Sequence, residues 1–194
     1  MAEDQLSKQK KTLVIGGSAG ALAMVLHIIQ SFSSDMNVAA LVVLHRKSTD
    51  DNVLLEVLKA KTPFEVREVE DKDEMQSGVV YIAPADYHVL VERDGTLTLD
   101  DSEKINFSRP SIDASFESAA EIYGPSLVCV LLSGANADGV EGLLTARARG
   151  AKVAVQDPKT AEFDYMPDQA VRRMKPDLLI SDKNVKDLYD LLRP

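Results

Sequence analysis

Three residues that could together perform nucleophilic chemistry, Ser18, His45 and Asp138, each follow an apolar run of the sequence. A serine hydroxyl becomes a nucleophile when an imidazole takes its proton, and a carboxylate can fix the tautomer of that imidazole and stabilise its cation. The apolar runs have the composition of buried strands, and the carboxyl ends of parallel strands lie at one edge of a sheet. The sequence therefore predicts a Ser-His-Asp triad at that edge.

The same residues also admit structural interpretations. Ser18 could cap the helix that follows it, His45 could be a loop residue beside the site, and Asp138 could be the N-cap of the next helix. Asp157, which follows the strand expected at 152–155, is a competing acid that spacing cannot separate from Asp138. The convergence of a serine, a histidine and an acid on one predicted edge favours the triad.

The order of the expected elements shows how these side chains are positioned. Leu13-Val14-Ile15 runs into Gly16-Gly17-Ser18-Ala19-Gly20, which predicts a strand, a tight turn and then a helix. Val38–Leu44 is almost wholly apolar, as in a central parallel strand that is covered on both faces. Further strands are expected at 64–67, 79–82, 126–132, 152–155 and 178–180, and helices at 21–32, 53–58, 112–123, 140–149, 166–173 and 185–192.

This alternation predicts an α/β fold with a doubly wound, mainly parallel, Rossmann-like sheet that has helices on both faces. Arg93-Asp94-Gly95 has the composition of a hairpin turn between strands at 87–91 and 96–99. We therefore expect an antiparallel hairpin to be added to the main sheet. Ligands of such sheets bind outside the carboxyl ends of the strands, where the predicted triad lies.

Composition limits the class of protein. The chain has 194 residues, of which 45% are hydrophobic and 27% are charged, as in globular proteins with a substantial core. We expect a flexible tail over 1–11 and a single domain over 12–194. The formal net charge of -9 argues against non-specific binding to nucleic acid, because contacts to phosphates need clustered Lys and Arg.

The sequence lacks the motifs of disulfide-bonded, secreted, membrane-spanning, metal-binding and dinucleotide-binding proteins. Cys129 is the one cysteine and lies in an apolar run, so we expect a core thiol and no disulfide. No signal peptide is recognisable and no run approaches the ~18 apolar residues that span a bilayer, so a cytoplasmic protein without membrane insertion is expected. His27 and His88 are expected to be structural, and the glycine turn lacks the G-x-G-x-x-G register of a dinucleotide site. We expect neither a metal nor a cofactor.

Several short motifs occur in a fixed order along the chain. They are Ile15-Gly16-Gly17-Ser18-Ala19-Gly20, His45, Tyr81-Ile82-Ala83-Pro84 with Tyr87-His88, Arg109-Pro110-Ser111-Ile112-Asp113, Leu132-Ser133-Gly134 with Asp138-Gly139, and Val155-Gln156-Asp157-Pro158 with Met166-Pro167. From about Thr12 to the C-terminus, this set resembles the catalytic domain of the CheB family of chemotaxis protein-glutamate methylesterases. The resemblance implies that Asp138 is the acid of the triad and that Asp157 is structural.

The resemblance also implies a substrate. Members of the family hydrolyse γ-glutamyl methyl esters on the cytoplasmic helices of chemoreceptors, and some also deamidate glutamines there. We therefore expect Ser18 Oγ to attack an ester carbonyl after His45 takes its proton, while Asp138 orients the imidazole and methanol leaves an acyl-enzyme. Backbone N–H groups of the turn, above all that of Ala19, are expected to hold the oxyanion. The other residues expected to line the site are Gly17, Arg109, Ser133 and Gly134.

The sequence departs from the family pattern in two places. Ala135-Asn136-Ala137 stands where the family usually has a methionine and a glycine, which removes a side chain that shapes the pocket. Most relatives also carry an N-terminal receiver domain that represses the esterase, and residues 1–11 are too short to hold one. The resemblance thus implies a freestanding enzyme or one regulated in trans by a receiver-domain protein.

Two further expectations concern partners. Arg46 and Arg109 are either contacts for the acidic helices of a methylated chemoreceptor or solvated loop residues. The altered segment 135–137 supports an alternative function, in which the protein is a catalytically weak member of the family that acts as a binding or signalling module.

Overall fold

Alternating side chains along the first strand build two cores, one on each face of a sheet. In β1 (Lys11–Gly17), Leu13 and Ile15 join one core and Val14 joins the other, because successive residues of a strand point to opposite faces. The chain is represented by a computed structural model that describes residues 10–46 and 51–193. Both cores extend over several strands, so the sheet is the central layer of the molecule.

Within the described ranges, seven strands form the main sheet, in the order β3-β4-β2-β1-β7-β8-β9, and every neighbouring pair is parallel. Besides β1 they are β2 (Val38–Leu44), β3 (Glu65–Glu68), β4 (Val79–Ile82), β7 (Leu127–Leu131), β8 (Lys152–Gln156) and β9 (Leu178–Ile180). The strand order reverses direction at β1, which has β2 on one side and β7 on the other. This reversal is where ligands bind in doubly wound sheets.

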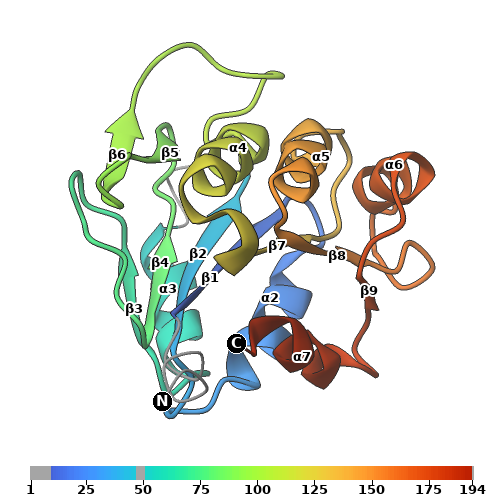
Figure 1. Cartoon of the computed structure of the whole chain (residues 1–194), viewed down its shortest axis with the longest axis horizontal. Helices are drawn as coiled ribbons and strands as arrows, with labels where there is room; N and C mark the ends of the chain where they lie inside the picture. The colour runs from blue at the N-terminus through green and yellow to red at the C-terminus, as the bar shows by residue number, and fades with distance from the viewer. Residues whose placement is uncertain (1–9, 47–50, 194) are drawn as a thin grey trace.

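Helices cover both faces of the sheet, as expected (Figure 1). One face packs against α4 (Ile112–Tyr123), α5 (Val140–Ala148) and α6 (Tyr165–Arg173). The other face packs against α2 (Leu22–Gln30), α3 (Asp51–Lys59), the short helix η3 (Val185–Asp187) and α7 (Leu188–Leu192). A further short helix, η2 (Gly124–Ser126), joins α4 to β7. The predicted doubly wound α/β fold is therefore confirmed.

The prediction that the hairpin extends the main sheet is wrong. β5 (His88–Val91) and β6 (Leu97–Asp100) form a separate antiparallel pair, because β3 already occupies the outer edge of β4. The backbone of β5 instead bonds to serines of α4: Ser115 Oγ donates to the carbonyl of Val89 (2.7 Å), and Val91 N–H donates to Ser118 Oγ (3.1 Å). The pair thus packs on α4 rather than on the sheet.

Two glycines let the first residue of α4 approach the ends of β1 and β7. A Cβ on Gly16 would lie 2.3 Å from Ile112 Cγ2, and a Cβ on Gly139 would lie 2.6 Å from the same atom. Gly139 also has a φ of 92°, in the left-handed region that favours glycine. Close packing at these positions brings the N-terminus of α4 to the edge of the sheet where the predicted triad lies.

Several smaller expectations can be placed in the structure. Of the expected tail over 1–11, residues 1–9 lie outside the described residues, and β1 begins at Lys11, which pairs with Val38. Cys129 is fully buried in β7, and this burial raises the pKa of its thiol. None of the helices in the described part of the chain is long and apolar enough to cross a membrane.

Candidate active site

The turn after β1 places Ser18 at the wall of a pocket. Ser18 N–H donates to the carbonyl of Ser133 (2.9 Å), and the Ser18 carbonyl accepts from Ala21 N–H (3.1 Å), so the backbone is held from both sides. The half-buried Ser18 lines a pocket of about 400 Å³ together with His45. Ser18 does not cap the helix that follows, because α2 has Ala21 as its N-cap and no side-chain cap.

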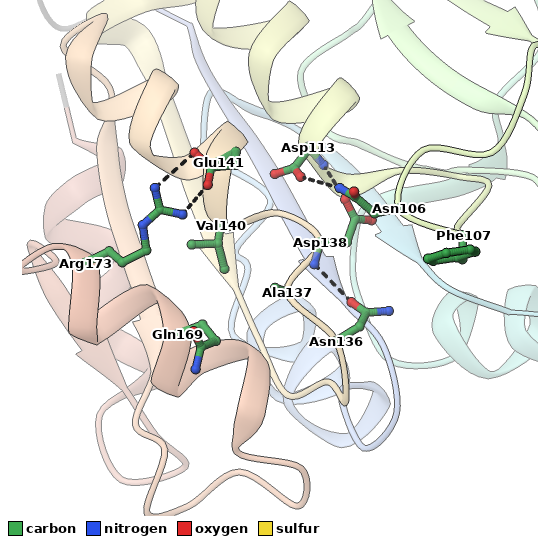
Figure 2. A pocket seen from close by; sticks show the side chains of 10 residues that line it. All are labelled: Asn106, Phe107, Asp113, Asn136, Ala137, Asp138, Val140, Glu141, Gln169 and Arg173. Carbon is green, nitrogen blue, oxygen red and sulfur yellow. Dashed lines mark hydrogen bonds and ion pairs between the residues drawn. The ribbon is translucent and has the colours of Figure 1, made fainter.

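The loop after β7 carries Asp138 and lines a second pocket, of about 360 Å³. Figure 2 shows Asn136 and Asp138 on one side of this pocket, Phe107 beside them, and Arg173 paired with Glu141 across it. His45 and Ser18 line the first pocket, whereas Asp138 lines the second. The predicted triad residues therefore border two neighbouring pockets, with Ser18 and His45 at the first and Asp138 at the second.

Asp138 is bound to the N-terminus of α4 and does not cap α5, whose N-cap is Gly139. Its side chain is fully buried. Oδ2 accepts from Ile112 N–H (2.7 Å), and Oδ1 accepts from Asp113 N–H (3.0 Å) and from the Ser111 hydroxyl (3.1 Å). The N–H groups of a first helical turn lack partners within the helix and attract anions, which explains how a buried carboxylate is kept ionised here.

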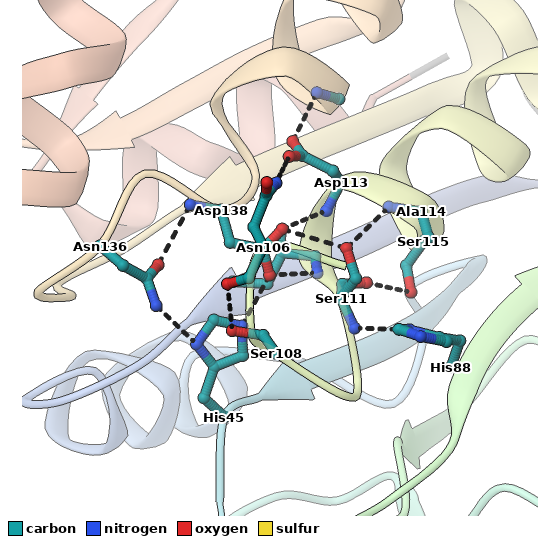
Figure 3. A network of polar contacts seen from close by, with 12 residues as sticks. His45, His88, Asn106, Ser108, Ser111, Asp113, Ala114, Ser115, Asn136 and Asp138 are labelled. Carbon is teal, nitrogen blue, oxygen red and sulfur yellow. Dashed lines mark hydrogen bonds and ion pairs between the residues drawn. The ribbon is translucent and has the colours of Figure 1, made fainter. Parts of the chain in front are cut away.

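His45 is the other partner of this carboxylate (Figure 3). His45 Nε2 lies 2.6 Å from Asp138 Oδ2, and the His45 backbone N–H donates to the carbonyl of Gly17 (3.2 Å). Burial by itself would raise the pKa of Asp138, but hydrogen bonds from His45 and from the first turn of α4 outweigh it, and the net pKa is lowered. An ionised Asp138 can only accept, so His45 Nε2 carries the hydrogen and Nδ1 keeps its lone pair.

The motif Arg109-Pro110-Ser111-Ile112-Asp113 builds the support for Asp138. Ser111 is the N-cap of α4, and its hydroxyl accepts from Ala114 N–H (3.3 Å) while bonding to Asp138. Asp113 reaches across to α5 and accepts from Gly142 N–H (2.7 Å). Burial, together with repulsion from Asp138, raises the pKa of Asp113 to about 6 although the Gly142 N–H opposes the shift.

Ser133 and Gly134 contact the turn that carries Ser18 and Ala19. Buried Ser133 donates its hydroxyl to the Ala19 carbonyl (2.8 Å) and accepts from Phe163 N–H (2.9 Å). A Cβ on Gly134 would lie 2.5 Å from Met166 Cε and 3.1 Å from Ser18 Cβ. Neither residue lines the two pockets described above, and both contact the turn around Ser18 through packing and hydrogen bonds.

The two arginines make contacts within the protein. Arg46 lines the pocket of Ser18, and its Nη2 donates to the Ala83 carbonyl (2.9 Å) and to Glu68 (3.1 Å). Arg109 Nη1 donates to the carbonyls of Asp101 and Ser102 (2.6 and 2.7 Å), so this side chain braces the loop that precedes α4.

The remaining candidate residues have other partners. His88 is buried, and both of its ring nitrogens have partners, as expected of a structural histidine. Nδ1 accepts from Ser111 N–H (3.0 Å), and Nε2 lies 3.0 Å from the carbonyl oxygen of Glu103. His27 pairs with Asp182 at the surface (2.8 Å). Asp157 accepts from Lys159 N–H (3.0 Å) in the turn after β8. Within the described ranges, no three His, Cys, Asp or Glu side chains gather so as to hold a metal ion.

Sequence reasoning missed the contact made by one residue of the site. Asn136 Nδ2 lies 3.4 Å from His45 Nδ1, and Asn136 Oδ1 accepts from Asp138 N–H (3.1 Å). The sequence singled out segment 135–137 only as a departure from a pattern. Because this contact depends on the path of a loop, no periodicity or spacing in the sequence could have revealed it.

Comparisons with known proteins identify a family and a fold that match this chain. A model of the CheB methylesterase family matches residues 13–187. The crystal structure of the Thermotoga maritima CheB methylesterase catalytic domain matches with a TM-score of 0.87 and 30% sequence identity, over 95% of this chain and 98% of that chain.

Relatives of similar sequence extend the comparison. A chain from Leptospira interrogans is 36% identical over 179 residues, which are 92% of this chain and 93% of that one. The protein-glutamate methylesterase/protein-glutamine glutaminase 2 of Methanosarcina mazei is 32% identical over 192 residues, which cover 95% of this chain and 52% of that protein. Sequence and fold agree over nearly the whole chain, which therefore belongs to the CheB methylesterase family.

Proposed function

We propose that this protein hydrolyses γ-methyl esters of glutamate side chains on the cytoplasmic helices of chemoreceptors, and deamidates glutamines at equivalent sites. Residues 12–194 act as one catalytic domain in this proposal. The observation that carries it is the His45–Asp138 pair at 2.6 Å, which lies beside the pocket that His45 shares with Ser18. A relative from Methanosarcina mazei whose name states both activities supports the choice of substrate.

Ser18 is the nucleophile and His45 is the base in this mechanism. Because Asp138 holds Nε2, the nitrogen that takes the Ser18 proton is Nδ1. Ser18 Oγ then bonds to the ester carbonyl carbon, and Asp138 stabilises the imidazolium that forms. The hydrogen bonds from α4 keep this carboxylate ionised and fixed in place.

The backbone N–H of Ala19 is our candidate for the oxyanion donor. Ala19 is exposed, and its N–H makes no hydrogen bond to any described residue. The other candidate N–H groups are engaged: Gly134 N–H donates to the Phe163 carbonyl (3.0 Å), and Ser133 N–H donates to Gln156 Oε1 (2.9 Å). One such donor typically lowers the barrier by about 3 kcal/mol.

Collapse of the tetrahedral intermediate expels the leaving group. For an ester, His45 returns the proton to the leaving oxygen and methanol departs; for glutamine, the same proton leaves with ammonia. A water molecule then attacks the acyl-enzyme, with His45 again as base, and releases the glutamate γ-carboxylate and free Ser18. Both reactions end in the same product, so a single site serves both activities.

The test uses a methylated cytoplasmic fragment of a chemoreceptor. We expect the protein to release methanol, and Ser18→Ala to lower the rate at least about a thousandfold. Labelling of Ser18 by a fluorophosphonate probes the triad without a receptor. Absence of Ser18-dependent methanol from several receptors would refute the esterase assignment.

A second candidate function is a catalytically weak module that binds receptors and signals. The observation in its favour is the altered segment 135–137, which lies against His45 through Asn136. Receptor binding without labelling of Ser18 would favour this module. A phosphorylated receiver domain added to either assay tests the proposed regulation in trans.

A further inference from the structure

Asn136 occupies the nitrogen that the proposed mechanism needs. His45 Nδ1 is the base, and Asn136 Nδ2 lies 3.4 Å from it (Figure 3). Asn136 belongs to segment 135–137, the part of the loop after β7 where the sequence departs from the family pattern. The contact with His45 therefore comes from the same loop that carries Asp138.

The orientation of the Asn136 amide is fixed by its other end. Asn136 Oδ1 accepts from Asp138 N–H (3.1 Å), and a rotated amide would place two N–H groups against each other. The group that faces His45 is thus the NH₂ donor. Since Asp138 fixes the hydrogen of His45 on Nε2, the amide donates to the lone pair of Nδ1.

A neutral imidazole has one lone pair in the plane of its ring, and it can accept one hydrogen bond well. Ser18 and Asn136 therefore compete for the same nitrogen. While the amide holds Nδ1, the imidazole is oriented and its tautomer is set, but it does not receive the Ser18 hydroxyl.

Resting on the function proposed above, we propose that Asn136 is a positioning residue that occupies His45 Nδ1 in the resting protein and releases it when substrate engages Ser18. Two observations support release. The contact of 3.4 Å is long for a hydrogen bond and so is easily broken. Asn136 is only half-buried between the exposed Ala135 and Ala137, and it lines a pocket of about 360 Å³ into which the amide can turn (Figure 2).

The first experiment measures the rate of Ser18 labelling by a fluorophosphonate. We expect Asn136→Ala and Asn136→Gly to label about three- to tenfold faster than the parent protein, which is the change that loss of one neutral hydrogen bond produces. The matched control is Asn106→Gly, because Asn106 lines the same pocket but bonds to Asp113 (3.3 Å) and not to His45. We expect the control to label at the parent rate.

The second experiment observes His45 itself by ¹⁵N NMR at a pH where its ring is neutral. The measurement is made with Ser18→Ala as the background, so that no Ser18 hydroxyl can replace the amide. There the Nδ1 signal, assigned by its loss in His45→Gln, is expected to move toward that of an unbonded ring nitrogen when Asn136→Ala is added and to stay unchanged when Asn106→Gly is added. A purely structural role for Asn136 would leave this signal in place. Equal thermal unfolding midpoints would show that the variants are folded.

The outcomes distinguish this inference from the proposed function. If Ser18 labels at equal rates in the parent and in both Asn136 variants, or more slowly in the variants, the inference is wrong while the triad stands. If no protein labels and methanol is never released, the proposed function fails. An unchanged Nδ1 signal in Asn136→Ala would overturn the inference by itself.

Discussion

Replacing Asp138 by asparagine changes the charge of the proposed triad while keeping its shape. Each oxygen of the side chain accepts two hydrogen bonds. Oδ2 accepts from His45 and Ile112 N–H, and Oδ1 accepts from Asp113 N–H and the Ser111 hydroxyl. An amide has only one accepting oxygen, so Asp138→Asn must give up contacts at one of the two positions.

The amide has two possible orientations. With its oxygen at the Oδ2 position, the bonds from His45 and Ile112 persist and the NH₂ group can donate to Ser111. Asp113 N–H and the Ser111 hydroxyl hydrogen then lose their acceptor. With the reverse orientation, the NH₂ group faces Ile112 N–H and donates to His45, which forces the other tautomer of the imidazole. The two orientations give the residue 138 side chain equal numbers of hydrogen bonds. In the reverse one, however, His45 Nδ1 carries a hydrogen that faces the Asn136 NH₂ group, so we expect the first orientation to dominate.

The cost in stability follows from the lost contacts. One buried N–H loses its partner, and the surviving bonds no longer involve a charge, which together costs about 2–4 kcal/mol. For a chain of this length, 1 kcal/mol lowers the unfolding midpoint by about 2–4 °C. We therefore expect Asp138→Asn to unfold about 5–15 °C below the parent protein, as measured by circular dichroism.

The cost in activity comes from the missing charge. Because His45 keeps its tautomer in the favoured orientation, only the electrostatic stabilisation of the imidazolium is lost. We expect methanol release to fall about a hundredfold, well short of the ~10⁴-fold loss that accompanies the wrong tautomer in a serine protease. Asp157→Asn, which changes the competing acid, is the control and is expected to keep parental activity.

Three results would refute this reasoning. A loss of less than tenfold in Asp138→Asn would remove Asp138 from the triad. A loss of 10⁴-fold or more would show that the amide takes the opposite orientation. A large loss in Asp157→Asn with little change in Asp138→Asn would assign the acid to the turn after β8.

Three further predictions use other contacts. Gly134→Ala should lower methanol release and the labelling rate of Ser18 together, because the new Cβ would lie 2.5 Å from Met166 Cε and 3.1 Å from Ser18 Cβ. Asp113 has a pKa of about 6 when folded against 3.8 when free, so its stabilising contribution is present below pH ~4 and lost as pH rises through 6. Urea unfolding should show that this loss, about 3 kcal/mol, is absent in Asp113→Asn. Cys129 should resist a thiol reagent until the protein unfolds, since burial raises the pKa of its thiol.

Local sequence patterns predicted most of the fold. Strand β2 was expected at 38–44 and helix α4 at 112–123, and both occur with these bounds. Such segments are predictable because a run of apolar residues, or apolar residues that recur with the period of a helix, indicates which side chains must be buried. The position of the β5–β6 pair was not predictable in this way. It depends on two serines of α4, one of which donates a hydrogen bond to β5 while the other accepts one from β5.

The candidate site was predictable in position but not in detail. Strand ends placed Ser18, His45 and Asp138 on one edge. Which nitrogen of His45 meets Asp138, and that Asn136 reaches the other, depend on loop geometry that spacing does not encode. The link between Asp138 and Ile112 joins residues 26 positions apart and becomes visible only when α4 packs against the ends of the strands.

The surroundings of two buried carboxylates at one helix terminus explain why Asp138, the acid of the proposed triad, stays charged. Asp138 and Asp113 repel each other, and both lie where burial disfavours charge. Asp138 accepts from two backbone N–H groups of α4, from a hydroxyl and from His45, and these bonds lower its pKa despite burial. Asp113 has fewer such donors, and its pKa rises. Environments that shift the pKa values of two acids in opposite directions give the acids different roles. In the proposed triad, Asp138 keeps the charge that would stabilise an imidazolium, whereas Asp113 links α4 to α5 and is the carboxyl that protonates more readily.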